Sequence, residues 1–144
     1  MFIGILLSAL AGFLMSVQGV FNTRVSENIG PWATNLLVQG SAFIVTLIIY
    51  LFYHKNNFKN INQVNKFYLL GGVIGVFITF TVMEGIKRLG TTYSISTILT
   101  AQLVTAAVID ALGLFETEQV KFSSFKYIGI VLMVAGIVLF KWKA

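Results

Sequence analysis

Residues 2–21 read FIGILLSALAGFLMSVQGVF, and no charged side chain interrupts them. The run is long enough to cross a bilayer as one helix, which requires about 20 mainly apolar residues. It also decides the class of the fold. Lipid offers no water to hydrogen-bond the backbone, and a run of this length satisfies its own N–H and C=O groups as a helix. We therefore expect an all-α integral membrane protein.

The rest of the chain repeats this pattern. Short polar segments separate the apolar blocks, and we predict five transmembrane helices in a single domain spanning residues 1–144: residues 2–21, 31–53, 67–86, 92–115 and 125–140. Pro31 opens the second block, where a proline is accommodated because the first helical N–H has no partner in its own helix. Every Trp and Tyr falls at a block end, which is typical of aromatic belts at the headgroup level.

The composition excludes several classes of function. Hydrophobic residues make up 57% of the chain and charged residues 10%, against roughly 25% charged residues in a soluble domain. The lipid bilayer is the expected partner, and a plasma or inner membrane the expected location. The net charge of +5 is spread between the apolar blocks, which argues against nucleic acid as a partner. One His and no Cys predict no metal site. No phosphate-binding or nucleophile motif is present, so we expect neither an enzyme nor a cofactor.

Lys and Arg are divided equally between the two sides of the membrane. Five helices place the termini on opposite sides, and side A is defined here as the side of Met1. Side A then carries Lys55, Lys59, Lys66, Lys121 and Lys126, and side B carries Arg24, Lys87, Arg88, Lys141 and Lys143. An excess in cytoplasmic loops normally sets orientation, and here there is none. Either the bias is weak and a loop or partner fixes the orientation, or copies insert both ways and pair antiparallel.

Small residues are spaced for close contacts between helices. We predict helix packing at Gly4, Ser8, Gly12, Ser16, Gly71, Gly75, Gly129 and Gly136. The first four recur at every fourth position of one block, and such a stripe allows another helix to approach closely in lipid. Five helices are too few to enclose a large pathway. We therefore expect a dimer, either of this chain with itself or with a similar chain.

Seven polar residues at membrane depth are candidates for binding a substrate or an ion: Gln18, Asn22, Gln39, Glu84, Thr100, Gln102 and Asp110. Polar groups are costly in lipid and by default suggest function. Glu84 precedes Arg88 by four residues, so a structural ion pair is the alternative there. The glutamines could equally cross-link helices, and Asp110 could reach the headgroups near side A. The fourth block carries polar residues on two faces, one with Gln102 and one with Thr100 and Asp110, and we expect it to line a cavity.

Three stretches carry a resemblance to a known family. The first is AGF at residues 11–13, followed by Gln18 and Asn22. The second is AQL at residues 101–103 followed by IDALGL at 109–114, which resembles a G-Q-L…D-H-F-G-L segment with Ala in place of Gly and Ala-Leu in place of His-Phe. The third is GIVLMVAGI at residues 129–137. Together they resemble the drug/metabolite transporter superfamily, and most its short five-helix YdcZ-type members.

The resemblance implies ten helices built from two inverted five-helix halves, with a central cavity that opens alternately to each side. Related four-helix exporters exchange protons for cationic drugs at a glutamate in the first helix, where this chain has Gln18 and Asn22. If an ion is coupled here, Asp110 is the better candidate and Glu84 the second. We expect a secondary transporter, an exporter of a small metabolite or drug-like molecule, acting as an antiparallel homodimer. The alternatives are a channel and a non-transporting partner or regulatory subunit of another membrane complex.

Overall fold

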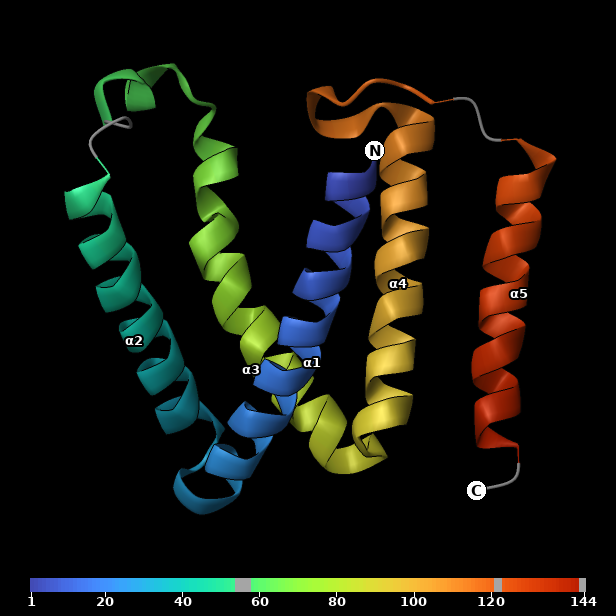
Figure 1. Cartoon of the computed structure of the whole chain (residues 1–144), viewed down its shortest axis with the longest axis horizontal. Coiled ribbons are helices and arrows are strands. Elements are labelled where there is room, and N and C mark those ends of the chain that lie inside the picture. Colours follow the sequence, from blue (N-terminus) through green and yellow to red (C-terminus); the bar gives the residue numbers. More distant parts are fainter. Residues whose placement is uncertain (54–57, 121–122, 143–144) are drawn as a thin grey trace. The chain divides into compact units, whose positions relative to one another are not determined.

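The computed structural model describes residues 1–53, 58–120 and 123–142, and every regular element in them is helical (Figure 1). The α-helices are α1 (Phe2–Ile29), α2 (Pro31–Phe52), α3 (Gly71–Leu89), α4 (Thr91–Leu112) and α5 (Ser124–Lys141). Short 3-10 helices cover Phe58–Gln63, Lys66–Leu70 and Leu114–Glu116. Four spans are long and apolar enough to cross a membrane, and α5 contributes a shorter apolar helix. The prediction of an all-α membrane protein is confirmed.

α1 is longer than the sequence predicts. We expected a helix over residues 2–21 and then a polar break, and the helix instead continues to Ile29. Hydropathy fails here because polar residues continue a helix readily when its neighbours cover them, and Asn22, Thr23 and Ser26 are all buried. The break is corrected to Gly30 alone.

The other helix ends lie within a few residues of the predicted ones. α3 begins at Gly71 rather than at residue 67, because Lys66–Leu70 form a 3-10 helix. α4 ends at Leu112 rather than at residue 115, because Gly113 adopts a left-handed conformation (φ 61°) that ends the helix. α2 and α5 match their predicted ranges to within one residue at each end.

Two single glycines connect helices directly. Gly30 (φ 84°, ψ 157°) lies between α1 and α2, and Gly90 (φ 76°, ψ 164°) precedes α4. This region of backbone space is essentially restricted to glycine. In both turns the glycine carbonyl accepts the first hydrogen bond of the next helix, from the N–H of Thr34 and of Ser94 respectively, each at 3.1 Å. Pro31 reinforces the first turn because the residue before a proline avoids the helical conformation.

The chain forms two compact units, Met1–Arg88 (unit 1) and Leu89–Ala144 (unit 2). Within unit 1, α1, α2 and α3 approach one another near the α1–α2 turn and diverge toward their other ends (Figure 1). We call residues 19–39 and 75–88 the convergent end, and residues 1–16, 41–52 and 71–74 the open end. All the buried residues described in unit 1 lie in the convergent end.

Unit 2 contains α4, α5 and the segment between them. The end of α4 is held by that segment, since the backbone N–H of Val120 donates to the carbonyl of Asp110 and the side-chain amide of Gln119 donates to the carbonyl of Ala111, both at 2.9 Å. These bonds satisfy two of the carbonyls that a helix end leaves without a partner. The backbone around Asp110 is therefore fixed by contacts outside its own helix.

Candidate functional site

The convergent end has a polar core. Its buried polar residues come from two helices, Asn22, Thr23 and Ser26 from α1 and Thr34 and Asn35 from α2, and only Met83 and Ile86 are buried hydrophobic residues. A soluble domain buries mainly apolar side chains. Here the apolar side chains can face lipid, and the polar ones are buried between the helices.

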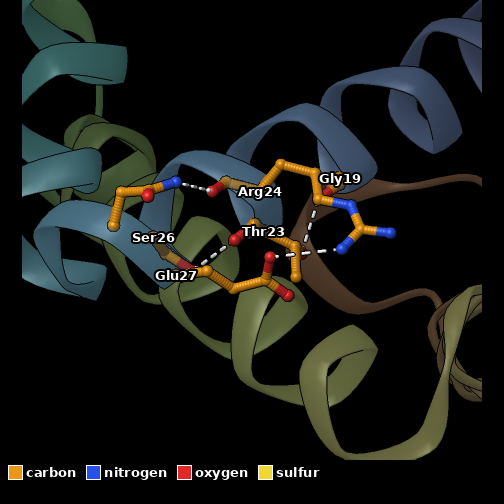
Figure 2. Close-up of polar contacts among 6 residues, drawn as sticks. Gly19, Thr23, Arg24, Ser26 and Glu27 are labelled. Atoms are coloured by element: carbon orange, nitrogen blue, oxygen red, sulfur yellow. Dashed lines mark hydrogen bonds and ion pairs between the residues drawn. The ribbon is translucent and has the colours of Figure 1, made fainter.

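Most hydroxyl groups in the polar core bond to their own helix. Figure 2 shows the Thr23 hydroxyl donating to the carbonyl of Gly19 at 2.7 Å and the Ser26 hydroxyl donating to the carbonyl of Thr23 at 2.8 Å. Thr34 bonds in the same way to the carbonyl of Gly30 at 2.8 Å. Such local bonds remove the cost of burying the hydroxyl.

Asn35 and Gln39 join α2 to α3. The side-chain amide of Asn35 donates to the carbonyl of Val76 at 2.8 Å, and that of Gln39 donates to the hydroxyl of Thr79 at 3.3 Å. Gln39 also passes close to Gly75, where an added Cβ would lie 3.9 Å from its amide nitrogen. Of the two interpretations open for Gln39, the structure shows the cross-link. The side-chain oxygen of Asn35 is buried and has no hydrogen-bond partner among the described residues.

The predicted small-residue stripe of α1 is not filled within the described chain. A Cβ added at Gly4 or Gly12 would meet no atom within 4 Å. At Gly19, in contrast, it would lie 2.9 Å from Cδ1 of Ile86 and 3.2 Å from Cγ1 of Val82. The close approach of α1 to α3 therefore occurs at a glycine that lies beyond the predicted stripe. The same test finds no neighbour at Gly71, Gly129 or Gly136.

Gln18 and Asn22 lie on one face of α1, along an open groove of about 530 Å³ whose other lining residues also come from α1. Asn22 is 8% exposed and belongs to the polar core, whereas Gln18 is exposed. The two residues therefore share one groove and differ in how far they are exposed. One is covered by the chain itself, and the other faces outward.

Glu84 forms the ion pair that its spacing suggested. Its carboxylate accepts hydrogen bonds from Nε and Nη2 of Arg88 at 3.3 and 3.1 Å. The Glu84 side chain is 24% exposed and that of Arg88 is 76% exposed. The pair lies in the last turns of α3, beside buried Met83 and Ile86. Its geometry fits the structural alternative.

α4 carries Thr100, Gln102 and Asp110 in three different surroundings. Thr100 donates to the carbonyl of Ser96 at 3.2 Å and lines a pocket of about 480 Å³ between α4 and α5. Asp110 lines a second pocket between the same helices, of about 490 Å³. Gln102 is exposed. Thr100 and Asp110 thus line two different pockets, both between α4 and α5, and their sharing of one face of α4 stays a prediction.

A family described as "Putative inner membrane exporter, YdcZ" has a model that matches residues 3–139 of this chain. The chain belongs to that family. With its four membrane-length spans it is a multi-pass protein of the inner membrane, and the resemblance noted in the sequence is confirmed. No curated protein and no solved structure matches the chain.

In this YdcZ-family chain, Gly19, Thr23 and Ser26 belong to the convergent end and were not among the predicted packing residues. Gly12, Ser16, Gly19, Thr23 and Ser26 follow one another at spacings of four, three, four and three, the pattern of one helix face. The predicted stripe used a fixed spacing of four residues and ended at Ser16, so it did not include the residues that continue the same face. Within the described residues no group of three His, Cys, Asp or Glu side chains is placed to hold a metal ion.

Proposed function

We propose that the chain exports a small metabolite by alternating access as an antiparallel homodimer, with α5 as a fifth membrane crossing. The observation that carries this proposal is the position of Gln102. It stands midway along α4, a span of membrane length, and its side chain is exposed. An amide at that depth cannot face lipid without cost. A water-filled cavity or a facing copy supplies its partners.

Other polar residues in the spans of each unit are exposed as well. Gln18 on α1 and Thr97 and Thr105 on α4 are also exposed in a single copy. A facing copy would place two such sets around one cavity, which is where transporters built from inverted halves hold their substrates. The uncovered stripe at Gly4 and Gly12 supplies a surface on which helices from two copies approach closely. In this proposal the substrate is moved unchanged, and the chain is not an enzyme.

The equal division of Lys and Arg between the two sides supports insertion in both orientations. A thiol reporter tests it, because the natural chain contains no Cys. Asn62→Cys reports from side A and Asn28→Cys from side B, and both positions are exposed. A membrane-impermeant maleimide applied to intact cells should label about half of each variant, and nearly all after permeabilisation. Complete labelling of one variant and none of the other would overturn the antiparallel homodimer.

Export itself is tested by comparing the metabolites in the medium of cells that produce the protein with those in the medium of cells that lack it. Mass spectrometry should detect one or more metabolites whose release requires the chain, and Gln102→Leu should abolish that release at unchanged abundance in the membrane. Gln63→Leu, the same change in an exposed 3-10 helix outside the spans, is the matched control. Equal release from the Gln102→Leu variant would exclude Gln102 from the cavity.

Asp110 is assigned the role of pairing with the substrate or titrating during the cycle. It is the carboxylate within α4 and it lines a pocket rather than the loop surface. A flux that Asp110→Asn leaves unchanged at every pH tested would remove Asp110 from this role.

A further inference from the structure

The pocket that contains Asp110 has a definite shape. α4 contributes Leu103, Ala106, Ala107 and Asp110, and α5 contributes Lys126, Gly129, Ile130 and Met133. The spacings of three and four on both helices make each set a single face. Small side chains line the centre, so the two helices leave a groove of about 490 Å³ between them.

The charged residues of this pocket gather at one end of it. Asp110 lies two residues before the end of α4 at Leu112, and Lys126 lies two residues after the start of α5 at Ser124. The remaining six residues of the lining carry no charge. The pocket is therefore amphipathic along its length, with one acid and one base at the end near side A and an apolar groove leading toward the membrane centre.

The helix ends reinforce these two charges. The carboxylate of Asp110 stands at the C-terminal end of α4, where the helix dipole is negative, and the ammonium of Lys126 stands at the N-terminal end of α5, where it is positive. One wall of the pocket thus attracts cations and the other attracts anions. A ligand with a single charge is attracted by one wall and repelled by the other.

We propose that this pocket binds a zwitterionic amphiphile, in which an ammonium with N–H donors and a phosphate or carboxylate head an apolar tail. The ammonium would pair with Asp110, the anion with Lys126, and the tail would lie along Leu103, Ile130 and Met133. Donor-bearing ammonium groups are favoured over quaternary ones because a carboxylate gains charge-assisted hydrogen bonds from N–H. The inference rests on the proposed export function and names the class of substrate.

Binding of three probes with the same dodecyl tail tests the assignment. The full chain in a neutral detergent is titrated with dodecyl phosphoethanolamine, dodecyl phosphate and dodecylammonium, and the thermal unfolding midpoint is followed. The zwitterion should bind at least about tenfold more tightly than either singly charged probe, the factor expected for one additional charge-assisted contact. Equal binding of the zwitterion and either singly charged probe would overturn the proposal.

Two variants resolve the two halves of the pocket. Asp110→Asn should weaken binding of the zwitterion by about tenfold and leave dodecyl phosphate no weaker, whereas Lys126→Gln should weaken both phosphate-bearing probes. Glu118→Gln and Lys66→Gln make the same changes at exposed positions outside the pocket and should change nothing. Unaltered zwitterion binding by Asp110→Asn would contradict the assignment. Midpoints without ligand show whether each variant is folded.

Flux measurements separate this inference from the proposed function. Proteoliposomes are tested with the same probes in parallel. The expected binding pattern without movement of any probe would support a binding pocket for the zwitterion and reject its export. Movement of a singly charged probe that depends on Gln102, without preference for the zwitterion in binding or flux, would leave export intact and reject the zwitterion.

Discussion

The two ends of unit 1 contain the same kinds of residue and place them differently. Gly19 at the convergent end lies against Ile86 and Val82, whereas Gly12 toward the open end meets nothing within 4 Å. Met83 is 0% exposed, whereas Met15 is 44% exposed. Residue type alone therefore does not separate an interior position from a lipid-facing one in this chain.

The reason for this difference lies in the solvent. In water, the burial of apolar side chains stabilises the fold. In a membrane, lipid tails are as apolar as these side chains, so moving a side chain from lipid into the protein gains little. Helices then associate through van der Waals contact and hydrogen bonds, which require close backbones. The convergent end has both, through Gly19 and through the bond from Asn35 to Val76. The open end has its glycines available and no described partner on them.

The largest contrast should come from the two methionines. Met83→Ala leaves a cavity at a position that is fully buried, and we expect a loss of about 2–3 kcal/mol in the free energy of unfolding, the lower part of the range for such truncations. Met15→Ala at the half-exposed position should cost under about 0.5 kcal/mol, since lipid fills the space. Reversible unfolding in mixed micelles measures both. Equal losses would mean that the convergent end is no more tightly packed than the rest of α1.

The glycine pair is the next contrast. Gly19→Leu must displace Ile86 and Val82 and should cost about 1–3 kcal/mol, the range for overpacking. Gly12→Leu should leave the stability of the single chain unchanged and weaken the dimer, if the stripe is where the copies meet. Unfolding in micelles reports the first effect, and cross-linking in membranes reports the second. A Gly12→Leu variant that dimerises normally would remove the stripe from the proposed interface.

The sequence predicted the number and rough extent of the helices because their signal is strong. Runs of apolar residues of membrane length, interrupted by polar segments, leave few alternatives. It failed at residues 22–29, where a polar stretch looked like a loop and is the last part of α1. Hydropathy measures preference for lipid, and Asn22, Thr23 and Ser26 avoid lipid by facing other helices.

The sequence predicted which polar residues belong to the candidate site better than it predicted which of them lie together. Gln39 and Glu84 were identified as polar at membrane depth, and the structure gives both of them partners within the chain. Asn35 was missed because it lies near the start of the second block, where polar residues are expected at the interface. Which polar residues are buried depends on where two helices cross, as at Gly19. The residue pattern of one helix does not show where the neighbouring helix crosses it.

A smaller effect is expected from Asn35. Asn35→Leu removes the bond to the carbonyl of Val76, and interhelical bonds in membranes average about 0.6 kcal/mol. The same change removes the buried oxygen that has no described partner, which offsets part of the loss. We expect a net cost of about 0.5 kcal/mol or less by unfolding in micelles. Asn28→Leu, at an exposed residue whose side chain bonds to the carbonyl of Arg24 in its own helix, should be neutral. A loss above the cost of Met83→Ala would show that the polar core, rather than packing, stabilises the convergent end.

The smallest effect should come from Glu84, and it decides what the ion pair does. The pair with Arg88 has the spacing of a helical ion pair and is partly exposed, so Glu84→Gln should cost about 0.3–0.5 kcal/mol. Glu27→Gln breaks the more exposed pair with Arg24 and should cost less. Raising the salt concentration should reduce both losses. Export provides the decisive comparison. Normal release from the Glu84→Gln variant would assign Glu84 to structure alone. Loss of release at this small stability cost would mean that the carboxylate acts in transport, since an ion pair of that strength cannot account for it.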